Sequence, residues 1–234
     1  MMAGKQRSGS RRRGPFSGVL RRWESFWMFF AGTSLSGRMA TRIAGLFTPP
    51  YMTRFHLARC GPRGYVDPTA IICHGLLNLA PKSFIADRVI IYQAEGGGSV
   101  TIATRAHVLR DSVLETGDGG QISIGEDTML HPRAQVMAYK GDIRIGAHAT
   151  IAPNCAFYAY NHSFVPGELI KKQPLVTKGG IRIEDGVWLG YGVIVLDGVT
   201  IGEGALVGAG SVVTHDIPPN AIVAGSPTKI LQMR

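Results

Sequence analysis

His162 is the side chain whose type and position point most directly to chemistry. It lies within residues 160–164 (YNHSF), where a regular repeat gives way to an irregular stretch of about 20 residues. An unperturbed imidazole has a pKa near 6.5, so at neutral pH it is mostly uncharged and able to accept a proton. We therefore predict that His162 acts as a general base. A corner histidine held by local hydrogen bonds is the alternative.

A six-residue repeat determines the fold that must position this histidine. Between residues 183 and 213 an aliphatic side chain occurs at every sixth position: Ile183, Leu189, Val195, Ile201, Val207 and Val213. A period of six fits neither an α-helix nor an ordinary strand. It is typical of a solenoid in which three hexads, each a short strand and a corner, make one triangular coil. The predicted fold class is all-β, a parallel β-helix with the aliphatic residues inside.

The same register continues upstream with interruptions. Ile145, Ile151 and Phe157 form one coil, and the next coil begins only at Ile183. An uninterrupted coil needs 18 residues, so the excess predicts an extruded loop at about residues 160–180. Loops of this length in a compact repeat are usually functional. The expected divisions are a partly helical N-terminal arm and entry segment at 1–64, the β-helix at 65–217, and a C-terminal tail at 218–234.

The histidines and cysteines lack the spacing of a metal site. The histidines weighed as a metal-binding set are His107, His131, His148 and His162. Their offsets within the hexads bring no three of them together, so we expect no metal. Three cysteines are an odd number and indicate neither a disulfide framework nor a zinc site. We expect a reducing, cytoplasmic environment and a core-filling role for Cys155.

The positive charge of the chain is concentrated at the N-terminus. The net charge is +9, and residues 1–63 contain 12 of the 25 Lys and Arg residues but one acid, Glu24. An aromatic run at 23–30 follows the first basic residues. The arginines that precede this run include Arg11, Arg12, Arg13, Arg21 and Arg22.

An arm of this composition could lie on an anionic membrane surface, at the inner face of the cell membrane. A helix that packs on its own solenoid or on a neighbouring subunit is the alternative, and an export signal is a weaker one because Glu24 interrupts the apolar run. No run reaches the roughly 18 apolar residues that span a bilayer. Residues beyond 63 are slightly acidic and carry no recognition motif, so we expect no nucleic-acid partner.

Residues 186–231 resemble the C-terminal half of the hexapeptide-repeat acyltransferases. The stretch begins GVWLGYGVIVLDGVTIGEGALVGAGSVV and ends IVAGSPTKIL. It is similar to the branch that contains maltose, galactoside and streptogramin acetyltransferases and the O-acetyltransferases of polysaccharide biosynthesis. The resemblance implies a left-handed β-helix, an exception to right-handed crossovers, and a homotrimer with active sites between subunits. It also implies an acetyl-CoA-dependent, or other acyl-CoA-dependent, O-acyltransferase acting on a saccharide or surface-glycan hydroxyl.

Such a reaction needs a base for the acceptor hydroxyl and donors for the oxyanion. The segment containing Asn161 and His162 resembles the family's catalytic-histidine segment, which implies that His162 is the base and that Asn161 lies beside the acceptor. Related segments often carry an acid two residues before the histidine, where this chain has Tyr160. Glu168, Asp142 or a backbone carbonyl could orient the imidazole instead.

The resemblance implies that backbone groups as well as side chains bind the acyl-CoA donor. The implied cofactor-binding residues are Gly190, Tyr191, Gly208, Ala209, Thr214, His215 and Lys229. The two glycine-containing pairs occupy equivalent corners of successive coils, where peptide N–H groups could bind the pantetheine arm and the thioester oxygen. Thr214 and His215 correspond to a segment near the adenine and 3′-phosphate, and Lys229 is a candidate partner of a phosphate. The glycines also have a purely structural interpretation, and Lys229 could be solvated.

Trp188 is expected beside the cofactor or acceptor, with corner capping as the alternative. Lys171, Lys172 and Lys178 give the long loop a basic rim that is compatible with acidic or nucleotide-linked sugars. Two other functions remain open: the same chemistry on an amine or small antibiotic, and a non-catalytic trimeric scaffold. His162 and the intact segment 208–211 argue against the scaffold.

Overall fold

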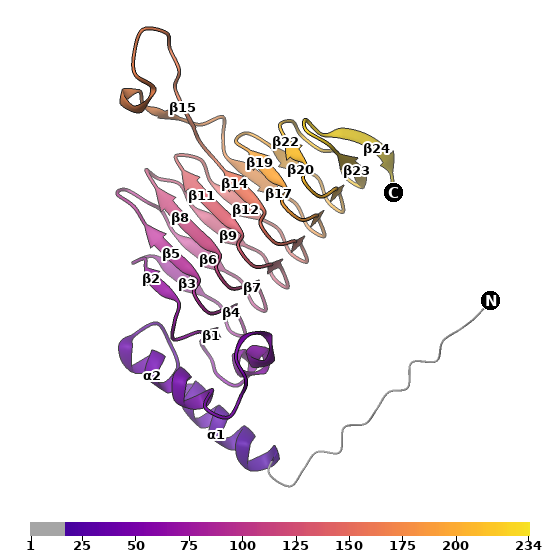
Figure 1. The fold of residues 1–234 in the computed structure, drawn as a ribbon. Coiled ribbons are helices and arrows are strands. Elements are labelled where there is room, and N and C mark those ends of the chain that lie inside the picture. Colours follow the sequence, from indigo (N-terminus) through magenta and orange to yellow (C-terminus); the bar gives the residue numbers. More distant parts are fainter. Residues whose placement is uncertain (1–16) are drawn as a thin grey trace, which may run out of the picture.

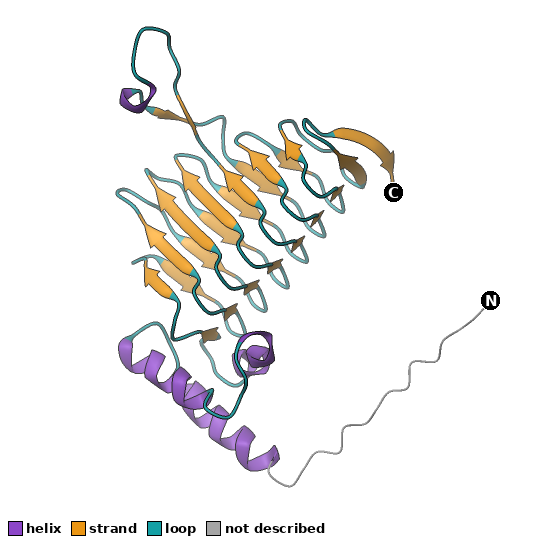
Figure 2. Ribbon diagram, viewed as in Figure 1, coloured by secondary structure: helices purple, strands orange, loops and turns teal. Residues whose placement is uncertain are grey.

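The computed structural model describes residues 17–234, and these form a β-helix with a helical segment at one end (Figure 1). Arg11, Arg12 and Arg13, which belong to the basic arm predicted above, lie outside the described residues. Figure 2 shows that most of the helical structure is gathered at the end of the prism that begins the chain, with one short helix in the projecting loop. The helical elements are α1 (Ser17–Phe29), α2 (Leu35–Ala44), the 3-10 helix η1 (Tyr51–Arg59) and, in the long loop, η2 (Ile170–Lys172).

Three parallel sheets form the sides of the prism. Sheet A contains β1 (Tyr65–Val66), β4 (Phe84–Ile85), β7 (His107–Val108), β10 (Met129–Leu130), β13 (Thr150–Ile151), β18 (Trp188–Leu189), β21 (Leu206–Val207), β23 (Ala221–Ala224) and the antiparallel β24 (Lys229–Met233). Sheet B contains β2 (Ile71–Cys73), β5 (Ile90–Gln93), β8 (Val113–Gly117), β11 (Gln135–Tyr139), β14 (Ala156–Tyr158), β19 (Ile194–Leu196) and β22 (Val212–Val213). Sheet C contains β3 (Leu77–Leu79), β6 (Val100–Ile102), β9 (Ile122–Ile124), β12 (Ile143–Ile145), β17 (Ile181–Ile183) and β20 (Thr200–Ile201).

The aliphatic residues of the hexads fill the interior of the prism, as predicted. Leu189, Val195 and Val207 are 0% exposed. Each lies in register with a residue of the same kind in the next coil; Val195, for example, pairs with Phe157 on one side and Val213 on the other. These ladders bury the apolar face of every coil against its neighbours, which no coil could do alone. The predicted β-helix with a partly helical N-terminal arm is therefore confirmed.

Cys155 is one of these core residues. Its side chain is fully buried, and its thiol donates a hydrogen bond to the carbonyl of Gly190 at 3.2 Å. Burial raises the pKa of the thiol to about 11. Because the thiolate is the reactive form, we expect Cys155 to resist dithionitrobenzoate at pH 8 in the native protein while the exposed Cys73 reacts. Labelling before and after denaturation measures this, and equal native rates for the two thiols would contradict it.

The helical segment, residues 17–63, closes the end of the prism at the first coil. We call it the helical cap. Arg38 donates hydrogen bonds through Nη2 to the carbonyls of Pro68 and Ala70, both at 2.6 Å. Phe55 packs edge-on against Phe84, with 4.6 Å between ring centroids. The cap thus covers the exposed edge of the first coil, the role that terminal repeats have in solenoids. None of the described helices is long and apolar enough to cross a membrane.

Candidate functional site

The long loop leaves the prism at the edge between sheets B and C and projects from it (Figure 1). It begins after β14 and returns at β17. At its base β15 (Asn161–His162) pairs antiparallel with β16 (Leu175–Val176), so that Asn161 lies opposite Val176 and His162 opposite Leu175. Asn161 and His162 are both exposed. The pairing therefore holds the predicted base on a short two-stranded ribbon, where solvent and ligands can reach it.

The orienting partner of His162 is not one of the predicted carboxylates. The carboxylate of Asp142 accepts hydrogen bonds from the Gln121 amide at 3.1 Å and from Arg144 Nη2 at 3.0 Å. Among residues 17–234 neither Asp142 nor Glu168 hydrogen-bonds to the imidazole. The nearby aromatic ring is that of Tyr160, whose centroid lies 6.5 Å from the imidazole in an edge-on arrangement.

Tyr160 belongs to an aromatic cluster that was missed from sequence. Its ring lies 5.2 Å from that of Tyr139 and 6.2 Å from that of Tyr158. The Tyr139 hydroxyl donates a hydrogen bond to the carboxylate of Glu115, and burial together with this contact raises the pKa of Tyr139 well above its usual range. A half-buried row of tyrosines therefore leads along sheet B to His162. Aromatic faces with polar rims of this kind can bind both the apolar and the hydroxyl-bearing parts of a ligand.

Asp197 anchors the returning end of the long loop. Its carboxylate is buried and accepts hydrogen bonds from Thr177 Oγ1 at 2.9 Å, the Lys178 amide at 2.5 Å and the Gly180 amide at 3.0 Å. It lies at the corner after β19, directly beyond the loop's own coil. The Asp197 side chain thus fixes the returning end of the loop to the neighbouring coil.

Replacing this carboxylate by a methyl group should release the loop. In Asp197→Ala three donors lose their acceptor, and we expect the free energy of unfolding to fall by about 1–3 kcal/mol. We also expect proteolysis within residues 160–180 to accelerate, because the loop loses its anchor. Chemical denaturation and limited trypsin digestion measure the two effects. Asp216→Ala is the matched control: Asp216 accepts one amide, that of Thr200, at the corresponding corner of the next coil.

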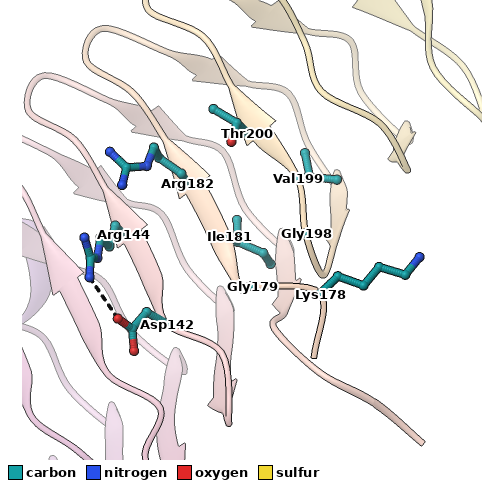
Figure 3. A pocket seen from close by; sticks show the side chains of 10 residues that line it. Asp142, Arg144, Lys178, Gly179, Ile181, Arg182, Gly198, Val199 and Thr200 are labelled. Carbon is teal, nitrogen blue, oxygen red and sulfur yellow. Dashed lines mark hydrogen bonds and ion pairs between the residues drawn. The ribbon is translucent and has the colours of Figure 1, made fainter. Parts of the chain in front are cut away.

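A cationic cavity lies beside this anchor. Its volume is about 320 Å³, and it is lined by Arg144, Arg182 and the loop segment 178–180. Arg144 and Arg182 are directly opposite each other on β12 and β17, as Figure 3 shows, and Asp142 pairs with Arg144. Like charges in a cross-strand pair are unfavourable without a counter-charge. Both side chains are more than half exposed, so an anion can reach them.

The two predicted glycine corners lie at a different edge of the prism, between sheets A and B. The amide of Gly190 donates to the Val207 carbonyl and that of Gly208 to the Val223 carbonyl, both at 2.8 Å. These two N–H groups are therefore already paired between coils and are not free to donate to a thioester. That the glycines bind the cofactor stays a prediction. A Cβ on Gly190 would lie 2.6 Å from the Ala209 nitrogen, so close packing of the coils explains this glycine.

The amides of Tyr191 and Ala209 remain as donors at this edge. No hydrogen-bond acceptor for either is found within the described part of the chain. The two residues occupy equivalent positions after β18 and β21, and both are exposed. They are the members of the predicted cofactor set whose backbone could bind the donor.

The remaining predicted residues lie either at the edge that carries the long loop or on sheet A. Thr214 and His215 follow β22 at the same edge as the long loop, and Thr214 Oγ1 lies 2.7 Å from His215 Nδ1. Lys229 begins β24 on sheet A and is exposed. Trp188, for which corner capping was the alternative to cofactor or acceptor contact, is the first residue of β18, in register between Thr150 and Leu206 and 52% exposed. Its strand position turns the indole outward from sheet A.

The repeat also identifies the chain by comparison with known proteins. Residues 180–215 match the model of the bacterial transferase hexapeptide (six repeats). A protein of Dictyostelium discoideum described as a candidate acetyltransferase is 39% identical over 130 residues, which are 56% of this chain and 67% of that protein. The chain belongs to the hexapeptide-repeat acetyltransferase family. The galactoside O-acetyltransferase of Lactococcus lactis is 40% identical over 89 residues, 38% of this chain. This hexapeptide-repeat chain aligns with about two fifths (42%) of the Lactococcus protein.

Solved structures of the family share the fold. The polySia-specific acetyltransferase NeuO superposes with a TM-score of 0.54 at 22% identity, over 70% of this chain and 82% of that one. A D94A variant of AntD, an N-acyltransferase from Bacillus cereus in complex with dTDP and coenzyme A, gives 0.55 at 20% identity, over 70% and 83%. At these identities the likeness concerns the architecture alone.

Proposed function

We propose that this protein transfers an acetyl group from acetyl-CoA to a hydroxyl of a saccharide or surface-glycan intermediate. The observation that carries the proposal is His162, presented by the β15–β16 ribbon at the edge of a hexapeptide-repeat prism. Family membership supports acyl transfer, and the relatives named galactoside O-acetyltransferase favour a hydroxyl over an amine as the acceptor.

In this reaction His162 takes the proton of the acceptor hydroxyl as its oxygen attacks the thioester carbonyl. A new C–O bond forms, and the carbonyl oxygen becomes an oxyanion that backbone N–H groups stabilise. The tetrahedral intermediate then collapses with cleavage of the C–S bond. The imidazolium returns its proton to the sulfur, so the products are an O-acetyl ester and the free thiol of CoA. The amides of Tyr191 and Ala209 are the proposed oxyanion and pantetheine donors.

These groups lie on different edges of one chain, which supports a homotrimer. His162 belongs to the edge between sheets B and C, whereas Tyr191 and Ala209 belong to the edge between sheets A and B. A neighbouring subunit can bring its own donor edge to the His162 loop of the first. The outer face of sheet B carries exposed apolar side chains, Ile71, Ile194 and Leu196 among them, suited to such packing.

The acceptor we propose is acidic or nucleotide-linked. Asp142 lies 3.0 Å from Arg144, and Glu184 lies 3.7 Å from Arg182. The lining of the cavity nevertheless holds three cations, Arg144, Lys178 and Arg182, against one carboxylate, that of Asp142. A phosphate or carboxylate of the acceptor would offset their repulsion. The tyrosine cluster would then bind the sugar ring. Free thiols and an acyl-CoA donor fit a cytoplasmic reaction.

The test is acyl transfer itself. Purified protein is offered acetyl-CoA with a panel of nucleotide sugars, lipid-linked sugars and free glycans, and release of the CoA thiol is followed together with the mass of the product. Because Cys73 is exposed and would react with a thiol reagent, the assay uses Cys73→Ser. Thiol release that depends on an acceptor and yields a product heavier by one acetyl group supports the proposal. An amine-acetylated product, or no turnover across the panel, contradicts it.

A further inference from the structure

Helix α1 has an outward face of exposed apolar side chains. Its inner face is buried, with Met28 at 0% exposure. On the opposite side Val19, Phe26 and Phe29 are 69%, 59% and 63% exposed. Their spacing of seven and three residues places them on one face of the helix. Aromatic side chains so exposed in a row mark an interaction surface.

The exposed phenyl rings of the cap are joined to the half-buried Trp23 and Trp27 in one aromatic cluster. Successive centroids lie 5.4–6.0 Å apart along the chain of rings Phe29, Phe30, Phe26, Trp27, Trp23 and Phe47. Helix α2 and the turn that follows it add Leu35, Met39 and Leu46, which are 85%, 53% and 62% exposed. Trp23 Nε1 donates to the Ile43 carbonyl, which holds the two helices together. The apolar face is thus a rigid part of the folded cap.

The charges around this face are all positive. The sole acid of residues 17–63 is Glu24, and its carboxylate is buried and accepts hydrogen bonds from Thr48 Oγ1 at 2.9 Å and His56 Nε2 at 3.0 Å. The cap therefore presents no carboxylate to solvent. Its exposed charged side chains are Arg21, Arg22, Arg42, Arg59 and Arg63.

We propose that the helical cap binds the surface of an anionic lipid membrane. Aromatic rings beside arginines match the acyl boundary and the negative headgroups of such a surface. A second copy of the cap would bring five further arginines against the first set with no acid to pair with them. Charge complementarity therefore selects lipid over self-association.

Binding through the cap would stand the prism end-on to the membrane. The cap is attached rigidly to the first coil, since Arg54 pairs with Asp67 at 3.2 Å and Arg38 binds the first-coil carbonyls. Figure 1 shows the cap at the opposite end of the prism from β23 and β24. His162 follows the fifth coil, and neighbouring strands lie about 4.8 Å apart, so its loop stands roughly 20 Å beyond the first coil. This proposal does not depend on acyl transfer.

Vesicle sedimentation with the full-length protein tests the proposal. We expect binding to vesicles of phosphatidylglycerol and phosphatidylcholine, and at least tenfold weaker partitioning to phosphatidylcholine alone or at 1 M salt, where the Debye length falls to about 3 Å. The variant Phe26→Ser/Phe29→Ser/Phe30→Ser and the variant Arg21→Glu/Arg22→Glu should each partition at least tenfold more weakly. Circular dichroism verifies that each variant is folded.

The matched control removes exposed apolar side chains at the other end of the prism. Leu231→Ser/Met233→Ser alters residues that are 65% and 56% exposed and should bind vesicles as the parent does. Parent protein that stays in the supernatant with phosphatidylglycerol vesicles overturns the proposal. So does an aromatic variant that binds as well as the parent. Sedimentation velocity tests the alternative, in which the face binds a second copy of the protein. A self-associated species that is lost only in the aromatic variant would support that alternative and overturn membrane binding.

Discussion

Replacing His162 with alanine is expected to lower turnover by about 10² to 10⁴-fold, the usual contribution of a general base. The loss should fall on kcat, because the imidazole acts on the proton that moves in the transition state. His162 is exposed on the β15–β16 ribbon and supports no buried contact, so the free energy of unfolding should stay within about 0.5 kcal/mol of the parent. Steady-state kinetics with the best acceptor of the panel, together with a denaturation curve, measure both quantities.

His148→Asn is the control for this experiment. His148 is also exposed, its weak contact is with Asp127 at 3.9 Å, and asparagine tolerates its left-handed backbone (φ +56°). The control should keep near-parental turnover. Near-normal activity of His162→Ala would remove the imidazole from the mechanism even if acyl transfer itself were observed. The two variants together therefore test the role of His162 independently of whether the protein catalyses acyl transfer.

The core of this molecule could be predicted from the sequence because one type of side chain recurs at one period. Leu189, Val195 and Val207 can all be buried only if each hexad is a strand and a corner. The loop could be predicted for the same reason: Ile145 and Ile183 are in register in sheet C but 38 residues apart in the chain. A strict repeat makes every departure from it visible.

The arrangement of the site could not be predicted, because it depends on which amides remain unpaired. Gly190 and Gly208 were expected to bind the donor, but each coil uses these N–H groups to bond the next. The free amides belong to the neighbours Tyr191 and Ala209, one residue further round the corner. A hexad pattern specifies which residues lie at a corner but not the direction of each N–H bond.

The tyrosines and arginines that the sequence analysis did not assign to the site differ in how easily they could have been predicted. Tyr139 and Tyr160 are 21 residues apart, the length of the local coil, so their contact could have been found by extending the register to polar positions. Arg144 and Arg182 are separated by the long loop, and their pairing follows only once β12 is known to lie beside β17. The cationic cavity is therefore a product of the loop's extrusion.

Phe157→Ala should have the largest effect on stability. Phe157 is 0% exposed and stacks between Val136 and Val195 in sheet B, on β14, the last strand of the prism before the loop. Loss of a buried phenyl ring costs about 3–5 kcal/mol when the neighbours cannot move into the space. Here they cannot, because both adjacent strands are held at their spacing by ladders of hydrogen bonds. Denaturant unfolding at fixed protein concentration measures the loss.

Phe164→Ala is the matched control, since it also removes a phenyl ring, but from the long loop, where the ring is 79% exposed. Its free energy of unfolding should change by less than about 0.5 kcal/mol. Equal losses for the two variants would contradict the ladder as the source of stability. The contrast has a functional consequence as well. Because Phe157 closes the coil from which the His162 ribbon emerges, the variant should lose turnover at temperatures just below its own unfolding midpoint, where Phe164→Ala remains fully folded.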